Sequence, residues 1–507
     1  MSGPGSSPVR SSLVLGVDSS TQSVKVELRR AEDGAIVATG RSPHPAATPP
    51  RSEQSPADWW RALVAACAQL GEARSKVGAV AVAAQQHGLV LLDDAGVALR
   101  PAPLWNDTTA APAAATLVAS LGARAWAQGC GSVPVASFTI AKLAQLHRSE
   151  PELLSRTTRV MLPHDYLTWR LCGAHVTDPG DASGTGWFDP ARGRYRTDLL
   201  AAAVDDPDAW VARLPQVLAS SAQAGRLTGE AAGELGMPPG VAVAAGTGDN
   251  MAAALGLGVA PGQVVISLGT SGTAYGVAEH PTADETGAVA GFASASRGFL
   301  PLVCTLNATR VTDTVAGWMG LHVDAFARLA LDADPAPVEA VLVPYFDGER
   351  TPNRPDAAGL LSGLRTGTGR AELARVAHDG VLCGLLDGVD ALRLAGLRVS
   401  GPPVLVGGGA RSAAYRQRAA DLWGTGIVVP EDDEVVATGA AVLAACALEG
   451  VSTRAVGDRW GLGGGAMVEP RPGAHPEEVR ARYRAARDRP GASKLTALGA
   501  PGAGDLT

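Results

Sequence analysis

A carboxylate at a strand-to-helix junction is the side chain in this sequence with the clearest setting for chemistry. Asp249 follows a short apolar run at 241–245, which reads as a buried strand, and a turn at 246–248 that carries almost no side chain. Asn250 and an Ala-rich helix come next, and the glycines before Asp249 allow another molecule to approach the backbone closely. Two interpretations stay open at this point: Asp249 caps the helix, a position where Asp is favoured, or it faces a ligand.

Two hydroxyl-rich hairpins have the composition of phosphate-binding turns. The first spans 13–28 around a turn at 18–23, and the second spans 263–280 around a turn at 269–273. Successive backbone N–H groups and hydroxyls in such tight turns form nests that bind anions. The hairpins lie about half the chain apart, so the sequence predicts two halves related by an ancient duplication. One such turn is a weak signal, but two at matching places beside Asp249 favour a phosphate site.

A glycine-rich turn in the second half is suited to a flat or anionic ligand. A strand at 404–406 enters Gly407, Gly408 and Gly409, and a helix follows from Ser412. Three glycines between a strand and a helix let such a ligand approach the backbone closely. The turn contains neither GK[ST] nor GxGxxG, so the sequence indicates neither a Walker loop nor a dinucleotide-binding fold.

Two polar clusters in the first half lie where a ligand would be held. A buried strand at 77–84 ends at Gln86 and His87, and ligands in α/β folds collect at the carboxyl ends of strands. His87 is either a ligand contact or a satisfied core histidine. The cluster at 105–107, a tryptophan beside an amide and a carboxylate, suits a polyhydroxylated ligand through stacking and paired hydrogen bonds. A surface turn with a buried tryptophan explains the same residues equally well.

Length and composition limit the classes of protein to which the chain can belong. A chain of 507 residues exceeds a single core, and we expect a flexible lead-in at 1–11, domains at 12–258 and 259–490, and a frayed tail at 491–507. The hydrophobic content of 46% with 18% charged residues is typical of a globular protein. The net charge of −7 argues against nucleic-acid and anionic-membrane partners.

Cysteine usage and hydropathy indicate the compartment. The six cysteines are scattered, without a CxxC pair or a clustered histidine, which is typical of free thiols in a reducing compartment and argues against metal sites and disulfides. No apolar run approaches the ~18 residues of a membrane span, and the N-terminus lacks the apolar segment of a signal peptide. We therefore expect a cytoplasmic protein that is a monomer or homodimer and has no membrane partner.

Taken together, these segments resemble those of the FGGY carbohydrate kinases, within the actin-type ATPase superfamily. The matching segments occur in the family's order between Leu13 and Gly450: GVDSSTQSVKV, SEQSPADWW, QQHG, LWND, LPHDYL, GDASGTGWF, GTGDN, SLGTSG, YFDGERTPN and GGGARS. The resemblance implies an α/β fold of two actin-like, ribonuclease H-like domains that flank a catalytic cleft. It also implies ATP-dependent phosphorylation of a ketose, with D-xylulose expected first and ribulose, gluconate and glycerol as alternatives on the same scaffold.

The resemblance assigns a role to each part of the site. Asp249 would be the general base that faces the sugar hydroxyl, and Asp18 would hold Mg²⁺ through a water molecule. The expected sugar contacts are Gln86, His87, Trp105, Asn106, Asp107, Asp249 and Asn250. The expected ATP contacts are Ser20, Thr21, Gly269, Thr270, Ser271, Gly407, Gly408, Gly409, Ala410 and Ser412.

These roles fit the physics of phosphoryl transfer. The transition state is loose, so catalysis consists mostly of positioning and of charge neutralisation by Mg²⁺ and hydrogen-bond donors. Because Mg²⁺ keeps several waters, one carboxylate on a phosphate loop suffices to hold it. The helix N-terminus favours the ionised form of Asp249 by about 0.3–1 kcal/mol, which predicts a slightly lowered pKa and a slightly weaker base.

One departure from the family concerns the sugar. Family members commonly carry an arginine shortly after WND, where this chain has Thr108, Thr109, Ala110 and Ala111. If that arginine holds the sugar or the closed state, substrate selection differs here, so the reaction type is more secure than the sugar. The competing class is a non-catalytic actin-type scaffold or sugar sensor, which can lose Asp249 and needs an output module. Asp249 is present and no basic or helix-turn-helix-like segment precedes the first hairpin, so we favour the enzyme.

Overall fold

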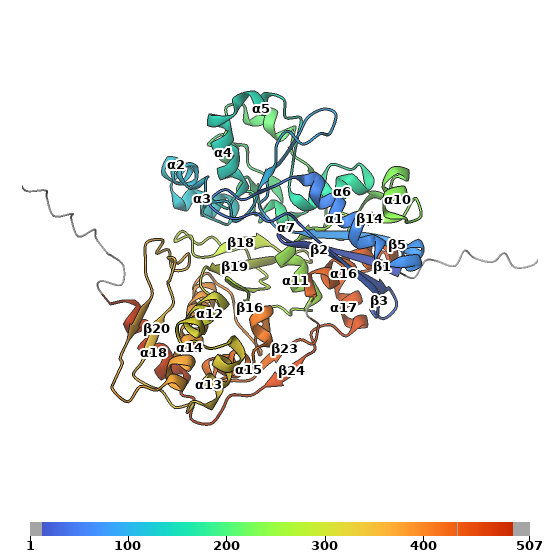
Figure 1. Ribbon diagram of the computed structural model, residues 1–507. Helices are drawn as coiled ribbons and strands as arrows, with labels where there is room; N and C mark the ends of the chain where they lie inside the picture. Colours follow the sequence, from blue (N-terminus) through green and yellow to red (C-terminus); the bar gives the residue numbers. More distant parts are fainter. Residues whose placement is uncertain (1–12, 433, 490–507) are drawn as a thin grey trace, which may run out of the picture.

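Two large mixed sheets, each with helices packed on it, form the framework of the molecule (Figure 1). The computed structural model describes residues 13–432 and 434–489. The lead-in expected at 1–11 and the tail expected at 491–507 lie outside the described residues. The expected α/β fold is thus confirmed, with one large sheet in each half.

The first sheet is built on the N-terminal hairpin. Its strands, in spatial order, are β13 (Gln223–Arg226), β14 (Ala242–Ala244), β5 (Val77–Ala84), β1 (Leu13–Ser19), β2 (Ser23–Arg30) and β3 (Ile36–Pro43), with β15 (Thr247–Gly248) paired to the end of β5. Strands β1, β5 and β14 run parallel, and β2 and β3 run antiparallel to their neighbours. Strands β5 and β14 consist of small apolar residues and are almost entirely buried, as expected for parallel strands covered on both faces.

The second sheet repeats the pairing of the first. Its strands, in spatial order, are β18 (Ala290–Ala293), β19 (Phe299–Thr305), β17 (Gly272–Gly276), β16 (Val264–Leu268), β22 (Val404–Val406), β23 (Ile427–Val429) and β24 (Ala466–Val468). The antiparallel hairpin β16–β17 corresponds to β1–β2, β19 corresponds to β3, and the parallel strands β22 and β23 correspond to β5 and β14. This shared topology agrees with the duplication that the two hairpins predict.

The remaining elements surround these sheets. The helices of the first half are α1 (Pro56–Ala68), α2 (Ala111–Leu121), α3 (Ala123–Cys130), α4 (Thr139–Ser149), α5 (Pro151–Ser155), α6 (Pro163–Cys172), α7 (Pro179–Ala182), α8 (Thr197–Leu200), α9 (Pro207–Val211), α10 (Gly229–Leu235) and α11 (Asp249–Gly256). Those of the second half are α12 (Thr309–Trp318), α13 (Val323–Asp332), α14 (Arg370–Leu394), α15 (Ala413–Trp423), α16 (Val435–Glu449), α17 (Thr453–Trp460) and α18 (Pro476–Arg487). Short 3₁₀ helices span Gly71–Lys76 and Gly408–Arg411. The short strand pairs are β4 (Glu53–Gln54) with β7 (Ala102–Pro103), β6 (Val90–Leu92) with β8 (Arg159–Met161), β9 (Val176–Thr177) with β12 (Gln216–Val217), β10 (Phe188–Asp189) with β11 (Arg194–Tyr195), and β20 (Val341–Val343) with β21 (Leu360–Ser362).

Helix α16 joins the two halves. Although it lies in sequence between β23 and β24 of the second sheet, it packs on β1 and β5 of the first sheet and crosses α11, as its position in Figure 1 also shows. The crossing requires glycine, because a Cβ on Gly439 would lie 1.8 Å from the Ala252 oxygen and one on Gly256 would lie 1.9 Å from the Val435 oxygen. The boundary expected at residue 258 separates the strands of the first sheet from those of the second. Helix α16 comes after this boundary in the sequence but packs on the first sheet.

The described helices also bear on membrane association. In residues 13–432 and 434–489, no single helix is long and apolar enough to cross a membrane. Helices α16 and α17 together have the required length and composition, but they are bent by 117° at their junction. Most of α16 is buried against the rest of the protein, which accounts for its apolar sequence.

Candidate active site

Two neighbouring pockets bring Asp249 close to the turns predicted to bind ATP. The first, of about 450 Å³, is lined by Asp249 and Asn250 from α11 and by the turn after β22. The second, of about 670 Å³, is lined by the turns after β16 and β22, and Arg411 lines both pockets. Of the residues predicted to contact ATP, Gly407 and Ala410 line the first pocket, and Gly269, Thr270, Gly408, Gly409 and Ser412 line the second.

Asp249 is the first helical residue of α11 and not its cap. Gly248 occupies the N-cap position, and the Asp249 Oδ1 atom accepts hydrogen bonds from the backbone N–H (2.8 Å) and Nδ2 (2.9 Å) of Asn250. Burial and the carboxylates of Asp18 and Asp181 raise the pKa of Asp249 to about 7. The interpretation as a cap is therefore wrong. The predicted lowering of the pKa is wrong too, because burial beside two carboxylates outweighs the helix N-terminus.

Gln86 is linked to Asp249 through Asn250. Its Oε1 atom accepts a hydrogen bond of 2.9 Å from Nδ2 of Asn250, which also donates to Asp249. Gly248 leaves the necessary space, since a Cβ on that residue would lie 2.7 Å from the Gln86 side chain. The structure therefore brings together three of the predicted sugar contacts at the carboxyl ends of β5 and β15.

His87 is held as a hydrogen-bond acceptor. Its Nδ1 atom lies 2.8 Å from the Gly184 carbonyl, which can only accept, so Nδ1 carries the proton and Nε2 is left as an acceptor. Burial and the nearby Lys142 lower the pKa of His87 to about 3, which keeps the ring neutral. The ring packs against Phe138, with centroids 5.0 Å apart, and against Phe292 of the second sheet, at 5.7 Å.

The backbone of His87 is in a conformation that costs free energy. Its φ of 65° lies in the left-handed region, which a non-glycine residue rarely adopts. Such strain costs on the order of 1–3 kcal/mol and persists where the surrounding structure requires it, often at a ligand site. The Lys142 ammonium supplies part of that support, because it donates to the His87 carbonyl at 2.7 Å. Strain together with a free acceptor favours the ligand contact over the satisfied core histidine.

The cluster at 105–107 is divided between two environments. Trp105 is partly exposed, and its Nε1 atom donates to the Thr21 hydroxyl at 2.9 Å, which ties this loop to the first hairpin. The Asn106 Oδ1 atom is buried and has no hydrogen-bond partner in the described part of the chain. Asp107 is buried and accepts from the Ser52 N–H and from the N–H and hydroxyl of Thr109. The Asp107 carboxylate thus stabilises the loop to which it belongs. Its partner Thr109 is part of the stretch 108–111, where the sequence departs from the family pattern.

Asp18 has the chemistry of a cation ligand. It lies at the end of β1, and its Oδ1 atom is buried without a hydrogen-bond partner among the described residues. Burial raises the pKa of Asp18 to about 7 against the opposing charge of Lys25. A carboxylate oxygen that lacks a donor fits a hydrated Mg²⁺, which binds few protein carboxylates and keeps several waters. The residues present therefore fit the metal that the resemblance implies.

Hydrogen bonds within each turn fix the predicted phosphate loops. The Ser20 hydroxyl donates to the Ser23 carbonyl at 3.1 Å in the first hairpin, and the Gly269 N–H donates to the Ser271 carbonyl at 3.0 Å in the second. Gly407 has a φ of 87°, and a Cβ there would lie 2.6 Å from a backbone oxygen of β16. Only glycine fits at that position, as expected for a turn that approaches a strand closely.

A buried cluster of one histidine and three aspartates lies behind the site, and the sequence alone predicts no role for it. We define the first cluster as His164, Asp165, Asp178 and Asp181, which are buried beneath Gln86 and Asp249. Burial lowers the pKa of His164, but the three carboxylates outweigh burial and raise it to about 9. The segments LPHDYL and GDASGTGWF contain three of these residues, so the available signal was a histidine and acidic residues in two short motifs.

Comparisons with known proteins agree with this arrangement. Residues 13–256 match the N-terminal domain of the FGGY family of carbohydrate kinases, and residues 264–448 match its C-terminal domain. The xylulose kinase of Streptomyces coelicolor is 46% identical over 460 residues, which cover 90% of this chain and 92% of that protein. The xylulose kinase of Escherichia coli is 37% identical over 425 residues, which cover 81% of this chain and 85% of that protein.

A solved structure agrees over nearly the whole length. The crystal structure of xylulose kinase from Bifidobacterium adolescentis superposes with a TM-score of 0.83 at 40% sequence identity. The match covers 94% of this chain and 99% of that one. With both domains matched and the fold shared over this length, the chain belongs to the FGGY family of carbohydrate kinases.

Proposed function

We propose that the protein transfers a phosphoryl group from ATP to D-xylulose and forms D-xylulose 5-phosphate, with Asp249 as the general base. The single observation that carries this proposal is the position of Asp249, which lines the first pocket and is linked through Asn250 to Gln86. The xylulose kinases at 46% and 40% identity support the choice of sugar.

Asp249 would accept the proton of the sugar hydroxyl as phosphoryl transfer proceeds. Its pKa of about 7 makes it a stronger base than an ordinary carboxylate while leaving about half of it ionised at neutral pH. Asn250 donates to one carboxylate oxygen and so fixes the direction of the other. The transition state is loose, so positioning of this kind contributes much of the catalysis.

The polar groups around Asp249 would select the sugar. His87 presents Nε2 as an acceptor, which suits a sugar hydroxyl that donates. Asn106 has a buried oxygen without a partner in residues 13–432 and 434–489, which suits a second hydroxyl. A site that hydrogen-bonds particular hydroxyls discriminates strongly against a ligand that leaves these groups unpaired.

ATP would occupy the second pocket and the turns that line it. Gly269, Thr270, Gly408 and Gly409 expose backbone to the ligand with little side chain in between. Mg²⁺ held through a water by Asp18 would neutralise charge on the phosphates. Water must be kept away from the transferred phosphoryl group. Closure of the two halves over the ligands would exclude it, so the turns themselves need not be apolar.

A panel of acceptors tests the proposal. ADP release is measured with Mg²⁺, ATP and each of D-xylulose, D-ribulose, D-gluconate and glycerol. We expect D-xylulose to give the highest kcat/KM. If another acceptor exceeds it by about tenfold, the assigned sugar is wrong although the chain remains a kinase; if no acceptor releases ADP, the proposed activity is wrong.

A further inference from the structure

A chain of polar groups runs from the first cluster to Asp249. His164 on α6 is fully buried, and its Nδ1 atom donates to Oδ2 of Asp181 at 2.7 Å. On its other side, Nε2 of His164 lies 3.1 Å from Oδ1 of Asp165. One imidazole therefore lies between carboxylates from two helices, α6 and α7.

Asp181 is fixed by the start of its own helix. Asp178 is the N-cap of α7, where its side chain accepts from the N–H groups of Gly180 (3.1 Å) and Asp181 (2.9 Å). The same Asp178 carboxylate accepts from the hydroxyls of Ser220 (2.6 Å) and Thr247 (2.7 Å). Thr247 lies two residues before Asp249, so Asp178 ties the backbone of the base to the cluster.

Asp181 and Gln86 each have one buried polar atom without a hydrogen-bond partner among the described residues. Oδ1 of Asp181 and Nε2 of Gln86 are both buried, and neither has a hydrogen bond of full geometry to a described residue. The Gln86 amide is nevertheless close enough to lower the pKa of Asp181. An ionised carboxylate can only accept, so it holds Gln86 with its NH₂ group toward Asp181 and its Oε1 toward Asn250.

The orientation of each amide follows from the one before it. Because Oε1 of Gln86 accepts from Nδ2 of Asn250, the Asn250 NH₂ group is the end that faces Asp249, and it donates to Oδ1 at 2.9 Å. If Asp181 were protonated, it could donate, and Gln86 would be free to turn over. Burial raises the pKa of Asp181, whereas the hydrogen bond and charge of His164 lower it.

From this geometry we infer that His164 is a positioning residue that orients Asp249 through Asp181, Gln86 and Asn250. The inference rests on the proposed role of Asp249 as the base. The charged groups that face His164 are Asp165 of α6 and Asp178 and Asp181 of α7 and its cap. His164 is not among the residues that line the second pocket, so its effect should appear in turnover and not in nucleotide binding.

The test compares two substitutions at this position. His164→Leu removes both the charge and the N–H, whereas His164→Asn keeps an N–H near the place of Nδ1. We expect His164→Leu to lower kcat by about ten- to a hundredfold, the range of one lost hydrogen bond to a charged group. The KM for ATP should stay within about twofold, and His164→Asn should recover at least about a third of wild-type kcat.

A control variant, His175→Asn, and a second substitution, Asp181→Asn, complete the test. His175→Asn removes another partly buried imidazole, whose Nε2 donates to the Val160 carbonyl at 3.1 Å, and it should leave kcat unchanged. If His164→Leu does not fold, Asp181→Asn breaks the next link with almost no change in volume and should give the same loss of kcat. The double variant His164→Asn with Asp181→Asn should lose no more than Asp181→Asn alone.

The outcomes separate this inference from the proposed function. Turnover is measured with whichever acceptor the panel identifies, so an error in the sugar does not imitate a failure here. A folded His164→Leu or Asp181→Asn that keeps kcat within about threefold overturns the inference, as does a loss that His164→Asn fails to recover. Retention of turnover by Asp249→Asn would instead overturn the role of Asp249.

Discussion

The two halves of the molecule each contain a buried cluster of charges, and the clusters differ in how their charges are matched. The first cluster places three carboxylates around one imidazole and leaves oxygens of Asp165 and Asp181 without a hydrogen-bond partner in the described chain. We define the second cluster as Arg375, Asp379, Arg418, Asp421 and Arg471.

Every carboxylate oxygen of the second cluster has a hydrogen-bond donor, although the buried Nε of Arg375 has no hydrogen-bond partner among the described residues. Arg418 is fully buried and donates to both oxygens of Asp379, at 2.6 and 3.0 Å, and to Oδ2 of Asp421 at 2.7 Å. Arg471 donates to Asp421 as well, at 2.8 Å. These pairs join α14 to α15 and to the segment after β24, so they fasten the helices of the second half together.

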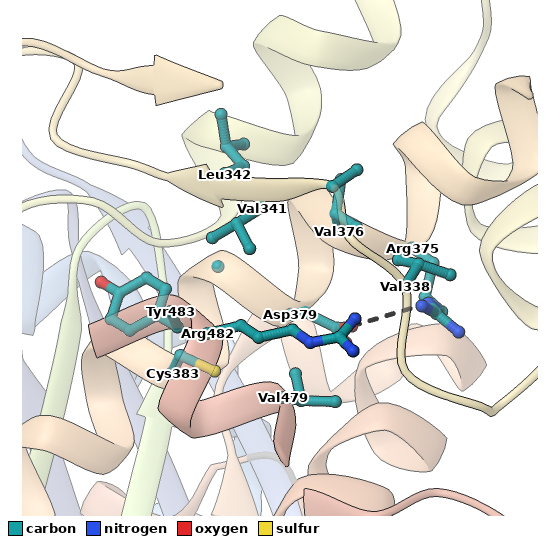
Figure 2. A pocket seen from close by; sticks show the side chains of 12 residues that line it. Val338, Val341, Leu342, Arg375, Val376, Asp379, Cys383, Val479, Arg482 and Tyr483 are labelled. Atoms are coloured by element: carbon teal, nitrogen blue, oxygen red, sulfur yellow. Dashed lines mark ion pairs between the residues drawn. The ribbon is translucent and has the colours of Figure 1, made fainter. Parts of the chain in front are cut away.

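The cavity beside the second cluster is too small for a substrate. Figure 2 shows Arg375 and Asp379 of α14 at its edge, joined by an ion pair of 3.7 Å. The cavity holds about 20 Å³, which is enough for a single water molecule. Carboxylates whose oxygens are all paired thus serve packing in the second half, whereas the buried carboxylate oxygens without partners lie on the side that serves the ligand.

Removal of the central arginine, Arg418, is expected to have the largest effect on stability. Arg418→Met leaves Asp379 and Asp421 with fewer partners in a buried setting, and we expect a loss of about 3–5 kcal/mol in the free energy of unfolding. Because Arg418 lines neither pocket, kcat of the molecules that stay folded should be unchanged. Urea denaturation and turnover below the transition measure both quantities.

An exposed ion pair provides the control for that experiment. Arg365 pairs with Glu339 at 2.6 Å on the surface, where solvent screens the two charges, so Arg365→Met should leave the midpoint of urea denaturation almost unchanged. Two results would contradict a purely structural role for the second cluster. Arg418→Met would shift the midpoint of urea denaturation no more than the control does, or it would lower kcat while the fold stays intact.

Acidification is expected to have an effect of intermediate size on activity. Asp249 must be ionised to accept a proton, and its pKa is raised to about 7, so activity is lost as the pH falls through 7. We expect kcat/KM to fall about tenfold for each pH unit below that value. Initial rates from pH 5.5 to 8.5, with the melting temperature recorded at each pH, make the measurement. A flat profile down to pH 5.5 with an intact fold would contradict the raised pKa.

Substitution at the edge of the site has the smallest expected effect. Trp105→Phe keeps the aromatic ring near the cleft and removes the Nε1 hydrogen bond to Thr21. One neutral hydrogen bond contributes about 0.5–1.5 kcal/mol, so the KM for the sugar should rise about two- to tenfold. Steady-state kinetics with the sugar varied are the measurement. A hundredfold loss of kcat would instead place Trp105 in the chemical step.

Much of the fold could be predicted because its signals are local. The hairpin at 263–280, the strand at 77–84 and the glycine turn after 404–406 each follow from an apolar run that ends in small or hydroxyl residues. The resemblance to the FGGY family was confirmed by both domain matches. The crossing of α16 onto the first sheet was not predicted, because nothing local in an Ala-rich helix says which sheet it covers.

The chemistry of the site depended on residues far apart in the chain. The raised pKa of Asp249 comes from burial and from Asp18 and Asp181, neither of which is near it in sequence. Asp107 bonds to Ser52 and to its own loop, a partnership that composition alone does not reveal. His164 gave no signal beyond its place in a short motif, because its importance lies in contacts that only the folded chain creates.

The central claim is that Asp249 removes the proton from the sugar, and Asp249→Asn tests it most directly. This substitution keeps nearly the same volume and removes the acceptor, and general-base assistance is typically ~10²–10⁴-fold in rate. We predict a kcat at least about a hundredfold below wild type, with the melting temperature and the affinities for ATP and D-xylulose close to wild type. A folded Asp249→Asn protein that keeps more than about a tenth of wild-type kcat would contradict the account.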